Sequence, residues 1–167
     1  MKKSILLSLI VLMPLLAIGQ NSAVDKLFKK YGGRDGFTTI TINQGLLKML
    51  SQLDENDEDI QALAGIKTIK ILAVEDDAKV KEINFYDEVM SKLKASDYEE
   101  LMTVDNKDEN VVFLAKKDGD IITELILVVG GDEDNALVYI AGSIRMKDVA
   151  KISKSIGVNG SIKVPGL

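Results

Sequence analysis

The chain has 167 residues, with 21 Lys+Arg against 26 Asp+Glu, no His, no Cys and no Trp. A chain of this length can bury roughly 68–70% of its unfolded surface in a single core, so its length predicts one domain and not two. The missing residue types exclude an imidazole base, a thiolate nucleophile, a zinc site of the usual nitrogen or sulfur kind, and a disulfide.

The N-terminus has the pattern of a secretory signal peptide. Lys2 and Lys3 give a basic start, residues 5–16 are mostly apolar, and residues 17–19 put small side chains at the −3 and −1 positions. The apolar stretch is shorter than the about 20 residues that cross a bilayer. We therefore expect cleavage after Gly19 and a soluble periplasmic or secreted product. Because the chain has no Cys, we do not expect a lipoprotein or a stable membrane anchor.

The expected mature chain is acidic. Removing 19 of the 167 residues leaves 148, with 19 basic side chains against 26 acidic ones and a balance of −7. Such a chain repels phosphate backbones and anionic lipid surfaces, and it has no local basic cluster. We expect no nucleic-acid partner. The partner would be another envelope protein or a small ligand.

Apolar periodicity predicts alternating helices and strands in the first half of the chain. A helix over residues 22–31 is followed by two glycines that would end it, and the β-branched run at 37–43 (FTTITIN) predicts a strand. The further elements expected here are a helix over 46–53, one or two helical turns over 60–65, a strand over 66–75 and the longest helix, over 80–93.

The second half has four strand candidates separated by polar turns, at residues 101–104, 111–116, 121–129 and 136–144. Asp118-Gly119 is a strong hairpin signal between two of them. The spacing of residues 96–99 matches a capping box, which would open a helix in place of the first of these strands. The strand at 121–129 is apolar on nearly both faces, which predicts a central position in the sheet.

These elements predict an α+β domain at residues 20–157, after a signal peptide at 1–19 and before a C-terminal tail at 158–167. The expected mixed sheet has about five to six strands, with an N-terminal β-α-β-α half, an antiparallel meander and a closing helix over 146–156. Strands joined through helices should cross over right-handed and parallel. We also expect a close approach to Gly142, by the closing helix or by a chain crossing the sheet.

A weak catalytic pattern occurs at Ser91 and Lys94. Their S-x-x-K spacing matches serine acyl enzymes, in which a helical turn brings the amine to the hydroxyl. No S-D-N or K-T-G motif accompanies it, and the lysines around Leu93 are typical of a solvated helix face. We predict no catalytic, cofactor-binding or metal residue and no cofactor. A Ser91/Lys94 hydrolase and a hydrolase built on paired carboxylates stay open as alternatives.

Two acidic loops and one glycine cluster complete the candidate sites. Residues 54–59 and 132–135 are rich in the oxygen ligands that weak extracellular calcium sites use, but neither fits the EF-hand frame. We interpret both as solvated turns, with calcium binding left open. The glycine cluster at residues 32–36 follows a helix, the opposite of a phosphate-binding loop, and predicts a helix stop and a turn.

The order of these patterns resembles a known family. An aromatic-bearing helix ending at Tyr31, the strand FTTITIN with its Leu/Met helix, IKTIKIL after Gly65, and TELILVV and VYIAGSI around Gly142 are similar to the exported domain-of-unknown-function family numbered 4252 of Bacteroidota. The resemblance covers about Ala23 to Ile156. It implies an envelope protein of unassigned activity, sometimes encoded near extracytoplasmic sigma-factor genes, and it transfers no catalytic residue. Many members look like lipoproteins, from which this chain departs by lacking the Cys.

The sequence favours a non-enzymatic periplasmic module that binds another envelope protein or a small ligand. Export, one domain and the absence of His, Cys and a catalytic constellation point to this function. The hydrolases named above are the competing class, and a component of envelope-stress signalling, associated with a sigma or anti-sigma factor, is a third.

Overall fold

The computed structural model describes residues 23–53, 57–75, 83–132 and 134–149. The predicted signal peptide, the C-terminal tail, most of the closing helix and residues 80–82 lie outside these residues. The longest helix, predicted over 80–93, is wrong in the part that is described, because only Phe85–Met90 is helical there. No helix in the described part of the chain is long and apolar enough to cross a membrane.

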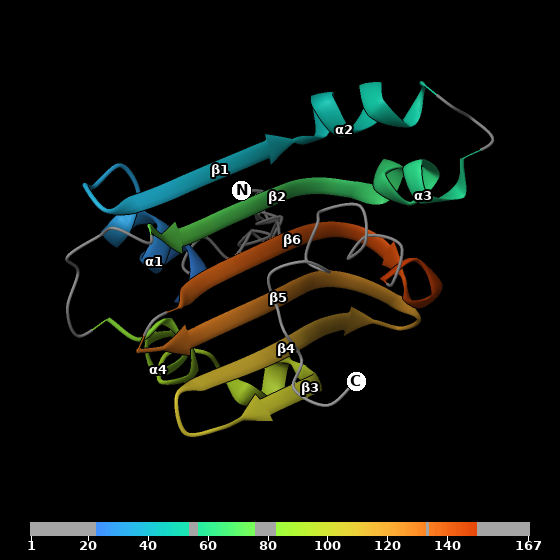
Figure 1. Cartoon of the computed structure of the whole chain (residues 1–167). Coiled ribbons are helices and arrows are strands. Elements are labelled where there is room, and N and C mark those ends of the chain that lie inside the picture. The colour runs from blue at the N-terminus through green and yellow to red at the C-terminus, as the bar shows by residue number, and fades with distance from the viewer. Residues whose placement is uncertain (1–22, 54–56, 76–82, 133, 150–167) are drawn as a thin grey trace, which may run out of the picture.

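The domain is an α+β fold with one six-stranded sheet in the order β1-β2-β6-β5-β4-β3 (Figure 1). The α+β class and the strand number are therefore confirmed. The strands are β1 (Phe37–Asn43), β2 (Ile66–Val74), β3 (Glu99–Asp105), β4 (Glu109–Asp118), β5 (Ile121–Gly131) and β6 (Asn135–Arg145). The helices and 3-10 turns are α1 (Ala23–Tyr31), α2 (Gln44–Ser51), α3 (Glu58–Gln61), η1 (Ala62–Gly65), α4 (Phe85–Met90), η2 (Ala95–Asp97) and η3 (Met146–Asp148).

Every strand pair in this sheet is antiparallel. The parallel crossover predicted for the first half is therefore wrong. A crossover must run back along the strand, which for the seven residues of β1 is about 23 Å. The eight residues of α2 span only about 12 Å. In Figure 1, α2 and α3 lie at one end of the sheet, so β2 returns beside β1 as an antiparallel strand.

The predicted meander and its central strand are confirmed. β3 to β6 follow one another as antiparallel neighbours, and β5 has a strand on each side. Asp118 ends β4, and Gly119 takes a φ of 60° in the two-residue turn before Ile121. The capping-box segment forms only the short η2 turn, and β3 begins at Glu99, so the strand reading of this region holds.

The sheet has a hydrophobic cluster on each face. On one face, Leu27 of α1 and Phe85 and Val89 of α4 pack over Leu72, Ile126 and other strand residues. On the opposite face, Leu47 of α2 and Leu63 of η1 pack at one end of the sheet, against Ile69 and Leu125 among others. Both faces of β5 are thus buried, as its apolar sequence predicts.

One residue of β5 departs from the alternation of faces that a regular strand would have. Strict alternation would place Ile122 on the side of Ile126, but Ile122 packs with Leu125. The pairing register shifts between Ile122 and Glu124, and such an irregularity reverses the side to which the following residues point.

The close approach to Gly142 is confirmed, but its partner is the start of β2. A Cβ atom at Gly142 would lie 2.4 Å from the carbonyl oxygen of Gly65 and 2.8 Å from the Cα of Ile66. Gly65 is equally restricted, because its Cβ would lie 2.3 Å from the carbonyl oxygen of Ser143. Two glycines therefore let β2 and β6 meet backbone to backbone where their register shifts.

Candidate functional site

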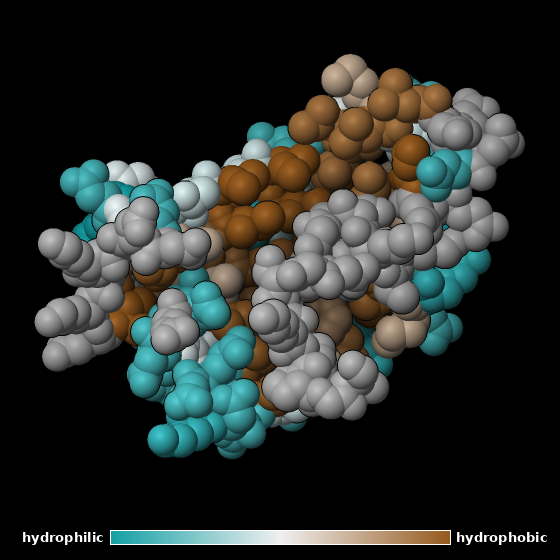
Figure 2. All heavy atoms as spheres, viewed as in Figure 1, coloured by the Kyte–Doolittle hydropathy of each residue, from teal (hydrophilic) through white to brown (hydrophobic). Residues whose placement is uncertain are grey.

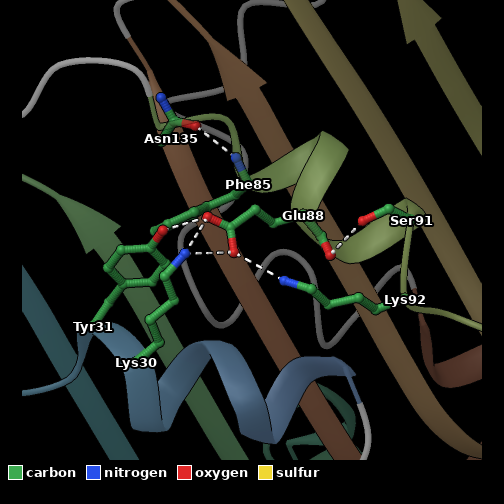
Figure 3. Close-up of polar contacts among 7 residues, drawn as sticks. All are labelled: Lys30, Tyr31, Phe85, Glu88, Ser91, Lys92 and Asn135. Carbon is green, nitrogen blue, oxygen red and sulfur yellow. Dashed lines mark hydrogen bonds and ion pairs between the residues drawn. The ribbon is translucent and has the colours of Figure 1, made fainter.

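Charged side chains join α1 to α4 around Glu88 (Figure 3). Lys30 Nζ lies 2.9 and 3.1 Å from the two carboxylate oxygens of Glu88, and Lys92 Nζ lies 3.1 Å from Oε2. The hydroxyl of Tyr31 donates a hydrogen bond to Oε1. We call Lys30, Tyr31, Glu88 and Lys92 the Glu88 cluster. Lys92 lies one helical turn after Glu88, whereas Lys30 and Tyr31 come from α1.

The Glu88 cluster favours the charged carboxylate. Burial raises the pKa of Glu88, but the hydrogen bonds from Tyr31, Lys30 and Lys92 outweigh burial and lower the pKa from 4.5 to about 2. Burial, and next the hydrogen bond to Glu88, raise the pKa of Tyr31 above its usual 10.0. A general acid needs a carboxyl that keeps its proton near neutral pH, so this arrangement suits an ion-pair connection between helices and not proton donation.

The start of α4 is held against the sheet by amide side chains. Asn84 caps the helix, because its side chain accepts a hydrogen bond of 3.0 Å from the backbone N–H of Asp87. The side-chain oxygen of buried Asn135, at the start of β6, accepts a bond of 2.9 Å from the N–H of Phe85 (Figure 3). Asn135 also donates to the carbonyl oxygen of Gly131 at 2.8 Å. These contacts fix the helix that carries Glu88.

A second polar group crosses β4, β5 and β6 on the sheet. Tyr98 donates a hydrogen bond of 2.8 Å to Oε2 of Glu124, and Lys116 Nζ lies 3.6 Å from Oε1. Burial, and next the bond to Glu124, raise the pKa of Tyr98 well above 10.0, and burial and the charge of Glu124 do the same for Tyr139. A tyrosine that acts as a base needs the opposite shift. Glu124, in β5, instead connects Tyr98, just before β3, to Lys116 of β4.

The predicted Ser91/Lys94 pair lies at the exposed end of α4. The Ser91 hydroxyl donates to the backbone carbonyl of Glu88 at 3.3 Å, as Figure 3 shows. It is Lys92, and not Lys94, that reaches the Glu88 carboxylate. This is the geometry of the surface-helix interpretation.

The structure describes the two acidic loops only in part. Asp57 caps α3, because its carboxylate accepts a bond of 3.2 Å from the N–H of Ile60. Residues 54–56 and 133 lie outside the described residues. Among the residues that the structure describes, no group of three or more acidic side chains is placed to hold a metal ion. The 32–36 segment is a helix stop and turn, as predicted, with Gly33 at a φ of 73° and Gly36 at 83°.

Three exposed apolar side chains lie on α2 and just beyond it. Leu46, Met49 and Leu53 are 45%, 58% and 74% exposed. We call these three side chains the α2 surface. Ile40 of neighbouring β1 is 44% exposed. Figure 2 shows apolar residues along this side of the molecule, over β1 and α2. Such a group of exposed apolar residues on a chain of this size is typical of an interaction site.

The sequence holds a signal for this surface that periodicity alone does not reveal. Residues 46–53 contain five large apolar side chains, and of these only Leu47 is buried. A helix that packs on a sheet by one stripe cannot bury apolar residues on all sides. The number of apolar residues in this segment exceeds what one stripe needs, which indicates that some of them stay exposed.

The family model of a domain of unknown function (DUF4252) matches residues 31–152 of the chain. Comparison with curated proteins gives no match, and comparison with solved structures gives none. The matched segment runs from the end of α1 to just past η3, so it includes every strand of the sheet. The chain therefore belongs to the DUF4252 family of domains of unknown function.

Proposed function

We propose that this protein is an exported, non-enzymatic module that binds another envelope protein through the α2 surface. The observation that carries the proposal is the exposure of Leu46, Met49 and Leu53, from 45% to 74%, on α2 and just beyond its end. Apolar side chains in the centre of an interface contribute most when they are removed from water together. Export is inferred from the signal-peptide pattern of residues 1–19.

The polar groups support binding over catalysis. The carboxylates of Glu88 and Glu124 are engaged by lysine and tyrosine side chains of neighbouring elements. Because both carboxylates are bonded to side chains of other elements, these two clusters connect elements of the domain. The α2 surface has no such internal role, because the core contacts of α2 are made by Leu47.

Site-specific photocrosslinking in the producing cell tests this function. A photoreactive side chain at Met49, 58% exposed, should give a covalent adduct with one defined envelope protein. The matched control carries the same group at Lys107, an exposed residue in the β3–β4 turn, and should give no adduct. No adduct at Met49, or the same adducts at both positions, would refute binding through this helix. Met49→Glu should abolish the interaction when the identified partner is tested with purified protein.

A further inference from the structure

The two edges of the sheet differ in how they are protected. β3 forms one edge and carries Glu99, Glu100 and Asp105, with a register shift after Glu100. Charges and irregularities of this kind prevent an edge from pairing with another chain. β1, at the opposite edge, pairs with β2 over all seven residues without a shift and contains no charged residue and no proline.

The β1 edge is regular and accessible. Within the described residues no strand lies beyond β1, and Thr38 to Thr41 are four consecutive exposed positions. A neutral, β-branched strand with its outer side open is a template for strand addition.

The register shows which backbone groups point outward. The N–H of Glu75 donates to the carbonyl oxygen of Gly36 at 3.0 Å, and these two residues continue the β1–β2 register by one position. In an antiparallel pair, alternate residues bond to the partner, so Ile40 bonds to β2 and its neighbours Thr39 and Thr41 direct their N–H and C=O groups away from it. The outer edge therefore presents the backbone groups of two threonines that flank Ile40.

We propose that β1 pairs with β1 of a second copy of this chain, antiparallel, about a two-fold axis at Ile40. This pairing goes beyond the proposed function, since it uses the strand edge and not the α2 surface. It places Thr39 of each copy opposite Thr41 of the other as hydrogen-bonded pairs. It places Ile40 opposite Ile40 as a non-hydrogen-bonded pair, in which side chains lie closest.

The sequence of β1 suits self-pairing better than pairing with an unlike strand. Around Ile40 the strand reads Thr, Ile, Thr in either direction, so a two-fold axis pairs Thr39 with Thr41 and Ile40 with Ile40. The absence of charge removes the like-charge repulsion that two copies of β3 would have. Ile42 belongs to the cluster under α2, so the Ile40 pair would extend that apolar face across the interface.

A single strand pair is a small interface, so the two copies should bind each other weakly. Contacts of this size are typical of weak or transient association, so we expect a dissociation constant on the order of 1–100 μM. Sedimentation velocity of the purified, processed protein from about 1 to 500 μM should show a mass that rises towards the dimer. Ile40→Lys and Thr41→Pro should each weaken dimerisation at least tenfold, because the first places two charges opposite each other and the second removes an outward N–H. Met102→Lys, on the β3 edge, is the matched control and should dimerise like the unaltered chain.

Cysteine crosslinking tests the register itself, because the chain has no native Cys. Ile40→Cys should form a disulfide-linked dimer under mild oxidation, since Cα atoms of a non-hydrogen-bonded pair are about 4.5 Å apart. Thr38→Cys should crosslink at least tenfold more slowly, because Thr38 would lie opposite Ile42. Urea unfolding midpoints identify any variant that fails to fold, and the variants that do fold then test the proposed dimer. Three results would overturn the proposal: a monomer at 500 μM, equal crosslinking at the two positions, or pairing of β1 with a different protein. None of them would contradict binding through the α2 surface.

Discussion

Gly130 shows how closely α4 approaches the sheet. A Cβ atom there would lie 2.3 Å from Oδ1 of Asn84 and 2.6 Å from the backbone nitrogen of Tyr86. We expect Gly130→Ala to lower the free energy of unfolding by about 1–3 kcal/mol, because the helix start must move away from β5. Gly45→Ala is the control, since no atom lies within 4 Å of its Cβ position in α2. It should raise stability by about 0.5–1 kcal/mol. Urea unfolding measures both, and equal effects would contradict this packing.

The Glu88 cluster makes stability depend on pH in a defined direction. The pKa of Glu88 is about 2 in the folded protein, below its ordinary value of 4.5. The contribution of the ionised Glu88 carboxylate to the free energy of unfolding is therefore fully present above about pH 4.5 and is lost as the pH falls towards 2. We expect Glu88→Gln to lower the free energy of unfolding at pH 7 by about 1–3 kcal/mol, reduced by the exposure of the two lysines.

The measurement is urea unfolding from pH 7 to pH 2.5 for both proteins. The difference between them should shrink below about pH 4.5, because the Glu88 carboxylate of the unfolded chain takes up a proton there while the native one stays charged until about pH 2. Glu75→Gln, at an exposed carboxylate, should change the free energy at pH 7 by less than about 0.5 kcal/mol. A difference that is constant with pH would show that the Glu88 ion pairs do not contribute.

Only part of the Glu88 cluster could be predicted from sequence. The Glu88–Lys92 pair follows from i, i+4 spacing on one helix. Lys30 and Tyr31 precede Glu88 by 58 and 57 residues, and their contacts exist only because α1 and α4 pack on the same sheet face. No local pattern encodes that proximity. The same holds for Gly65 and Gly142, whose contact depends on the pairing of β2 with β6.

Among the elements, the strands were the most predictable. The β-branched residues of FTTITIN predict a strand at 37–43, which are the bounds of β1. The direction of β2 was not predictable from the presence of helices alone. It depends on whether the connecting helices are long enough to return along the strand, and α2 and α3 are too short.

The central position of β5 predicts a large cost for truncating its side chains. Ile126 is fully buried between β4 and β6 and packs in the cluster under α1 and α4. We expect Ile126→Ala to lower the free energy of unfolding by about 2–5 kcal/mol. Lys107→Ala, in the exposed β3–β4 turn, should change it by less than about 0.5 kcal/mol. Similar urea midpoints for the two variants would mean that β5 is not central.

For the whole molecule, the N-terminal segment makes a prediction about processing. If residues 1–19 are a signal peptide, the exported protein should begin at Gln20, which often cyclises to pyroglutamate. Intact-mass measurement of the protein recovered from the producing cell distinguishes the outcomes. A mass that retains Met1 would show that the segment stays attached and would remove the main support for an exported, soluble module.

The contact between β2 and β6 has a consequence for how the domain folds. β3 to β6 are joined by short turns, so their pairing closes small loops, whereas Leu72 of β2 lies opposite Leu137 of β6, about 65 residues later. Closing the longer loop costs more chain entropy, and non-local pairing slows folding. We expect the four-stranded meander to form first and the β1–β2 pair to join it late. Until then the outer side of β6 is a second unpaired edge, open to the kind of edge-to-edge pairing that is proposed for β1 in the dimer.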